Sequence, residues 1–195
     1  MARQAIINRK TNETEIALEI ELGSSRKSEI RSGIPFFDHM LDHIAKHGRI
    51  HINLNATGDI EVDGHHTVED VGICFGQALN KALGERKSIK RYGHFSLPME
   101  ETLANIALDI CNRPLLVFNT PLTNGKVGDF DVELVKEFFY ALTRNCGMTL
   151  HVNVPYGENL HHIAEGIFKS FGHALKEAIS IDPTIDGVLS TKGVL

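Results

Sequence analysis

The stretch HHTVEDVGICFGQALNKAL at residues 65–83 recurs 96 positions later as HHIAEGIFKSFGHALKEAI at residues 161–179. The two segments are identical at eight of nineteen positions, and three of these form a repeated H-H-x-x-E pattern. The other identical residues are apolar or small and lie at helical spacing, which indicates an amphipathic helix in each copy. Imidazole and carboxylate groups are good ligands for manganese, iron or zinc. The repeat therefore predicts a duplicated protein whose copies each carry metal-binding side chains.

Helix geometry limits what each copy of the pattern can do. Residues i and i+4 share a face, whereas adjacent residues diverge by about 100°, so the second histidine of each pair points elsewhere. If the two helices pack side by side about a pseudo-twofold axis, each supplies its second histidine to the other's site. One metal site then takes His65, Glu69 and His162, and the other takes His161, Glu165 and His66. The alternative is two solvated helix ends with incidental histidines.

Composition narrows the class of protein. The chain has 195 residues, of which 42% are hydrophobic and 23% charged, as in an ordinary globular protein with a sizeable core. The net charge of −5 gives no support for nucleic-acid binding, and no apolar run predicts a membrane span. Cys74, Cys111 and Cys146 lack C-x-x-C spacing, which argues against a disulfide framework or a thiolate zinc site. Without a signal-peptide pattern, we expect a cytoplasmic protein.

The first part of the chain alternates strand and helix patterns. Period-two apolar residues predict strands at 3–10 and 14–22, and the polar, Gly/Ser-rich segment 23–33 predicts a mobile loop. A helix is expected over 36–47, started by a proline and closed by a glycine. Another strand follows at 50–54, before the first H-H-x-x-E helix.

The second part repeats this order. Residues 106–110 (IALDI) echo residues 16–20 (IALEI), and a helix over about 131–145 precedes a strand at 149–154. Each half thus reads as β-β-α-β-α. We expect an α+β fold with an internal duplication, in which each half has a mainly antiparallel sheet with helices packed on one face. The half-repeats 1–90 and 91–195 are expected to pack together as one domain.

Four motifs and the tail together resemble one enzyme family. They are FDHMLDH at 37–43, HHTVED at 65–70, LPMEE at 97–101, HHIAE at 161–165 and STKGVL at 190–195. The chain is similar over nearly its whole length to imidazoleglycerol-phosphate dehydratase. The resemblance implies a hydro-lyase of histidine biosynthesis that converts imidazole glycerol phosphate to imidazole acetol phosphate. It also implies two Mn²⁺ ions per active site and a homo-oligomer of twenty-four subunits with active sites at subunit interfaces.

Carried over by position, the resemblance implies a set of site residues. One metal is held by His39, His66, His161 and Glu165, and the other by His65, Glu69, Glu137 and His162. The acid–base carboxylate falls on Glu13, which also contacts substrate and reaches the site of a neighbouring subunit. The remaining substrate contacts are His43, His47, Arg91, Arg113, Lys169, Ser190, Thr191 and Lys192.

One position departs from the family pattern. The family usually has a histidine immediately before the pair Phe138-Phe139, where this chain has Glu137. A carboxylate is still a competent ligand for Mn²⁺, and position 137 is the repeat partner of His39, with one residue inserted or deleted before Gly48 and Gly147. We therefore expect Glu137 to be a ligand; the alternative is that it faces solvent.

Two other functions fit ligand-type residues in a duplicated pattern. A binuclear hydrolase would cleave a phosphate ester, but such sites usually need a bridging carboxylate that the motif does not provide. A metal-storage or structural protein would leave the basic residues Arg91, Arg113 and Lys169 without a role. The metal–metal distance distinguishes the first alternative, and binding of a phosphate-bearing imidazole distinguishes the second.

Overall fold

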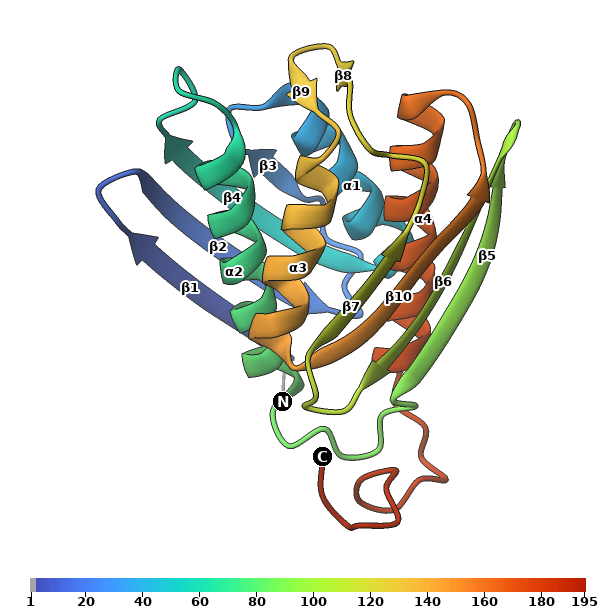
Figure 1. Cartoon of the computed structure of the whole chain (residues 1–195). Helices are drawn as coiled ribbons and strands as arrows, with labels where there is room; N and C mark the ends of the chain where they lie inside the picture. Colours follow the sequence, from blue (N-terminus) through green and yellow to red (C-terminus); the bar gives the residue numbers. More distant parts are fainter. Residues whose placement is uncertain (1–2) are drawn as a thin grey trace.

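Two four-stranded sheets enclose four helices in the computed structural model, which describes residues 3–195 (Figure 1). The first sheet has strand order β1-β2-β4-β3, and the second has the matching order β5-β6-β10-β7. In both sheets the last strand pairs in parallel and the others are antiparallel. The expected α+β architecture of two similar, mainly antiparallel sheets with helices is thereby confirmed.

The first half contains four strands and two helices. They are β1 (Gln4–Lys10), β2 (Thr14–Leu22), β3 (Glu29–Arg31), α1 (Pro35–Gly48), β4 (Ile50–Gly58) and α2 (His65–Leu83). The segment 23–33, which was expected to be a loop throughout, contains the short strand β3, and this strand pairs with the middle of β4. Only three residues are involved, and such a short strand leaves little period-two signal among polar neighbours.

The second half has the same elements and one additional hairpin. They are β5 (Tyr92–Met99), β6 (Thr102–Ile110), β7 (Leu115–Asn119), β8 (Lys126–Val127), β9 (Phe130–Asp131), α3 (Leu134–Cys146), β10 (Met148–Tyr156) and α4 (Leu160–Ile179). The helix expected over about 131–145 begins only at Leu134, because Asp131 belongs to β9, which pairs with β8.

Strand pairing gives the register of the duplication. Leu22 pairs with Ile50 and Ile110 pairs with Met148, so β2 and β6 are related by 88 residues. The apparent echo of 16–20 in 106–110 was therefore displaced by two residues. A two-residue displacement keeps the same face of a strand inward, so the hydrophobic pattern alone did not reveal it.

The helices α1 and α3 correspond without a gap. Each is followed by a residue in the left-handed conformation, Arg49 (φ 49°) and Gly147 (φ 70°), and these two caps are 98 positions apart. His39 and Glu137 are also 98 positions apart. The expected insertion or deletion was wrong. It came from aligning Gly147 with Gly48, whereas the structural counterpart of Gly147 is the cap residue Arg49. Glu137 is thus the structural counterpart of His39.

The helices pack in pairs drawn from different halves. α2 lies against α3 and α4 lies against α1, whereas α2 and α4 do not pack on each other. Repeated glycines allow the close approach: a Cβ on Gly76 would lie 2.6 Å from the carbonyl oxygen of Leu142, and one on Gly172 would lie 3.1 Å from the Cβ of His47. The side-by-side packing of the two H-H-x-x-E helices considered from the sequence was therefore wrong for a single chain.

All four helices run in the same direction, so their amino ends gather at one end of the molecule (Figure 1). The C-terminal tail after α4 lies at the opposite end. None of the helices within residues 3–195 is both long enough and apolar enough to cross a membrane.

Candidate metal centre

Three imidazoles surround one buried carboxylate at the amino ends of α1 and α4. The Oε2 atom of Glu165 lies 2.9 Å from Nε2 of His161, 3.2 Å from Nε2 of His39 and 3.4 Å from Nε2 of His43. The other carboxylate oxygen accepts from Lys169 one turn along α4. Helical spacing places the pairs 39/43 and 161/165 on facing surfaces.

Protonation states in this cluster suit a metal site. Burial raises the pKa of Glu165, but hydrogen bonds from Lys169 and His161 outweigh it and lower that pKa to about 2. Burial lowers the pKa of His43 to about 4. An ionised carboxylate and a neutral imidazole are the forms that bind metal. The cluster has the nitrogen and oxygen donors that a divalent first-row metal such as Mn²⁺ accepts, so these residues fit the expected cofactor.

The equivalent positions on α2 and α3 are arranged more loosely. His65 and Glu137 line one cleft of about 520 Å³, together with Thr120 and Lys136. No hydrogen bond or ion pair joins Glu137 to His65 or Glu69 within residues 3–195. On the other helix pair, His39 at the position equivalent to Glu137 lies 3.2 Å from the carboxylate of Glu165.

The second histidine of each pair binds a carboxylate on its own half. His66 Nδ1 lies 3.0 Å from Asp59, and His162 Nδ1 lies 2.8 Å from Glu101. These hydrogen bonds raise the pKa of both histidines. The sequence interpretation did not identify Asp59 or Glu101. Neither His66 nor His162 reaches the partner cluster that was expected for it, because α2 and α4 are apart.

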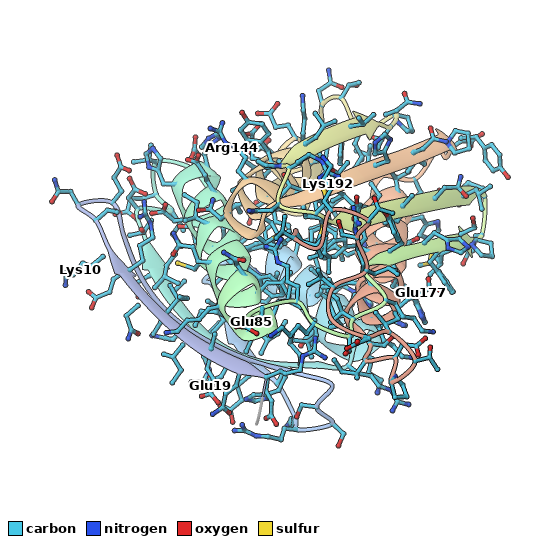
Figure 2. All side chains as sticks on the ribbon, turned by 90° about the horizontal axis from the view of Figure 1, so that it is seen from below. Lys10, Glu19, Glu85, Arg144, Glu177 and Lys192 are labelled. Atoms are coloured by element: carbon cyan, nitrogen blue, oxygen red, sulfur yellow. The ribbon has the colours of Figure 1, made fainter. Side chains whose placement is uncertain are left out.

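The expected phosphate-binding residues fall into two groups. Arg91 is buried, forms a two-pronged pair with Asp109 at 2.7 and 3.0 Å, and donates to the carbonyl of Leu189 on the tail. Arg113 lies near the same aspartate at 3.6 Å but is largely exposed. Ser190, Thr191 and Lys192 continue the tail there, and Figure 2 looks onto this end with Lys192 labelled. Lys169 is not in this group, since it lies at Glu165.

Comparison with known proteins identifies the family. The family model described as imidazoleglycerol-phosphate dehydratase matches residues 32–175. The chain belongs to the imidazoleglycerol-phosphate dehydratase family. It is 56% identical over 189 residues to the enzyme of Clostridium kluyveri, covering 97% of each chain, and 52% identical over 195 residues to that of Geobacter metallireducens, covering both chains fully.

Solved structures agree with this assignment. The crystal structure of imidazoleglycerol-phosphate dehydratase from Staphylococcus aureus matches with a TM-score of 0.84 and 38% identity, covering 92% of this chain and 99% of that one. The resemblance read from the motifs is confirmed, and the family assignment argues against the hydrolase and storage-protein alternatives. Enzymes of the imidazoleglycerol-phosphate dehydratase family are hydro-lyases of histidine biosynthesis.

Two further histidines on α1 have different surroundings from each other. His43 contacts the carboxylate cluster, as a pocket-lining residue should. His47, one turn further along, instead places Nδ1 3.1 Å from Nε2 of His173, whose ring stacks on Phe95. Within one chain of this dehydratase, His47 therefore contacts His173 on α4 and not the carboxylate of Glu165.

Proposed function

We propose that this chain removes water from imidazole glycerol phosphate to give imidazole acetol phosphate. The observation that carries the proposal is the cluster of His39, His43 and His161 on the carboxylate of Glu165, in a chain that matches the family along its whole length. A phosphorylated imidazole substrate also gives the basic residues near the tail a role. Arg113 and Lys192 are exposed cations suited to a phosphate.

Two Mn²⁺ ions per active site are part of the proposal. One would be held by His39, His66, His161 and Glu165, and the other by His65, Glu69, Glu137 and His162. A bound divalent ion supplies charge that lowers the pKa of groups it touches, including a substrate imidazole. Glu13 is the proposed acid–base group, because it is exposed at the β1–β2 turn and lies 3.9 Å from Nε2 of His66 at the metal end of the molecule.

The active site is proposed to form between copies of the chain. The backbone N–H of Arg91 binds the carbonyl of Ala178, thirteen residues beyond Glu165 on α4. At 1.5 Å per residue the metal cluster and the phosphate end are about 20 Å apart, too far for one small substrate to bridge. The two ends meet only if another copy contributes its tail. This geometry supports a homo-oligomer, for which we propose twenty-four subunits in the cytoplasm.

A direct assay tests the proposed reaction. Purified protein with Mn²⁺ and imidazole glycerol phosphate should produce the enol and ketone absorbance of the acetol phosphate. Glycerol phosphate, which lacks the ring, is the matched control and should give no signal. Hydrolysis to inorganic phosphate without ketone formation would contradict the proposal.

Substitution of the two arginines should separate phosphate binding from folding. Arg113→Ala removes an exposed cation and should raise KM by about ten- to a hundredfold with a smaller change in kcat, as expected for a contact made in both ground and transition states. Arg91→Ala removes both close hydrogen bonds to Asp109 and should also lower unfolding stability by about 1–3 kcal/mol. Steady-state kinetics and thermal unfolding measure both effects. An unchanged KM in both variants would rule out the assignment.

Glu137 should bind the metal shared with His65, Glu69 and His162. Glu137→Ala should reduce the Mn²⁺ retained after dialysis from two ions per subunit toward one, whereas Glu137→His restores the usual ligand and should keep both ions and activity. Glu133→Ala, on the same cleft, is the control and should retain both ions. Full retention by Glu137→Ala would show that this carboxylate faces solvent.

A further inference from the structure

His66 and His162, the second histidines of the two H-H-x-x-E motifs, each bind a carboxylate through Nδ1. Asp59 Oδ2 lies 3.0 Å from Nδ1 of His66, and Glu101 Oε2 lies 2.8 Å from Nδ1 of His162. No hydrogen bond engages Nε2 of either ring in the described part of the chain. A carboxylate on Nδ1 fixes the tautomer that carries its proton there, which leaves the Nε2 lone pair available to a metal.

The carboxylates come from different places in the two halves. Glu101 is 88 residues from Glu13, so the two are structural counterparts at the β5–β6 and β1–β2 turns. The counterpart of Asp59 is Glu158: β10 shifts register by one residue between Asn153 and Tyr156, so Tyr156 corresponds to Thr57. The carboxylate of Glu158 forms no hydrogen bond or ion pair within residues 3–195, and its backbone N–H donates to Oε1 of Glu101 at 3.3 Å. In the second half the turn carboxylate of Glu101, and not the counterpart of Asp59, therefore binds the histidine.

The two turn carboxylates consequently have different surroundings. Glu101 accepts hydrogen bonds from His162, from Oγ1 of Thr102 at 2.9 Å and from the backbone N–H of Asn159 at 2.9 Å. The Glu13 carboxylate accepts no hydrogen bond from residues 3–195 and is 54% exposed. The backbone carbonyl of Glu13 accepts a hydrogen bond from the N–H of Asp59 at 3.2 Å. Asp59, which binds His66, is therefore held beside Glu13 without using the Glu13 carboxylate.

We propose that Asp59 and Glu101 are positioning residues that present Nε2 of His66 and His162 to the metal ions, so that Glu13 alone of the two duplicated turn carboxylates is free for proton transfer. This inference rests on the proposed function, because it assumes that both histidines bind metal. The competing assignment is direct metal binding by Glu100, Glu101 and His162, whose ligand atoms lie within 4.8 Å of one another.

Metal affinity distinguishes the two assignments. Competition with a fluorescent chelator should show that Asp59→Ala and Glu101→Ala each bind Mn²⁺ about 10–100-fold more weakly than the parent protein. Asp59→Asn and Glu101→Gln keep a carbonyl acceptor for Nδ1–H and should recover most of the affinity. Glu61→Gln and Glu100→Gln, exposed acids close to each site, should bind like the parent. Glu13→Gln should also keep its affinity.

The possible failures are distinguishable. Equal losses in Glu100→Gln, Glu101→Gln and Glu101→Ala would show direct coordination and overturn the positioning role. Parent-like affinity in both alanine variants, in a protein that binds Mn²⁺ through His66 and His162, would overturn it as well. If His66→Ala and His162→Ala themselves bind Mn²⁺ like the parent, the metal assignment of the proposed function fails instead.

Discussion

Glu13→Gln should lose about 10²–10⁴-fold in kcat, the usual contribution of a general acid–base group. The substitution keeps the size of the side chain and removes its ability to carry a proton. The Glu13 carboxylate is exposed and free of hydrogen bonds within the described residues, so folding should be unaffected. Steady-state kinetics should show a KM within an order of magnitude of the parent, and thermal unfolding should show the same midpoint.

Glu101→Gln is the matched control for that experiment. It changes the structural counterpart of Glu13 in the other half, where the amide oxygen can still accept from His162 while the amide nitrogen replaces the oxygen that accepts from Asn159. It should keep most of its turnover. A Glu13→Gln variant with nearly normal kcat would transfer the acid–base role to another group.

Removal of metal should abolish activity entirely. The proposed ligands come from segments far apart in the sequence, at residue 39, at 65–69, at 137 and at 161–165. Dialysis against a chelator should bring turnover to background, and added Mn²⁺ should restore it. Because binding to the folded assembly stabilises it, size-exclusion chromatography should also show smaller species without metal.

Two controls accompany the chelation experiment. The chelator already saturated with Mn²⁺ should have no effect, and added Mg²⁺ should restore little activity because imidazole ligands suit Mn²⁺ better than Mg²⁺. Full turnover by a preparation shown to contain no metal would refute the dependence.

The sequence predicted the duplication, and the placement of His161 beside Glu165, because both depend on local spacing. The H-H-x-x-E pattern placed Glu165 one helical turn from His161, and in the structure Nε2 of His161 lies 2.9 Å from Oε2 of Glu165. It also identified Glu137 as the partner of His39. Family resemblance, rather than spacing, supplied His39 and Glu13.

The missed features depend on long-range packing. The sequence did not predict which helices pack together. Glycines such as Gly76 and Gly172 indicate that another element approaches closely, but they do not identify that element. Asp59 and Glu101 were missed because a carboxylate that supports a histidine has no fixed sequence distance from it; the separations here are 7 and 61 residues. The ion pair between Arg91 and Asp109 was likewise not predicted, because it depends on how β5 and β6 pair.

Mixing two inactive variants tests most directly whether the active site forms between subunits. His66→Asn and Glu165→Gln each damage the same proposed metal site, so each protein alone should be inactive. Within one chain these residues lie on α2 and α4, which do not pack together. Dissociation by chelation, mixing and reassembly with Mn²⁺ should create sites with an intact His66 from one copy and an intact Glu165 from another. We predict that activity returns in the mixture; hybrid assemblies that form and stay inactive would contradict a shared site.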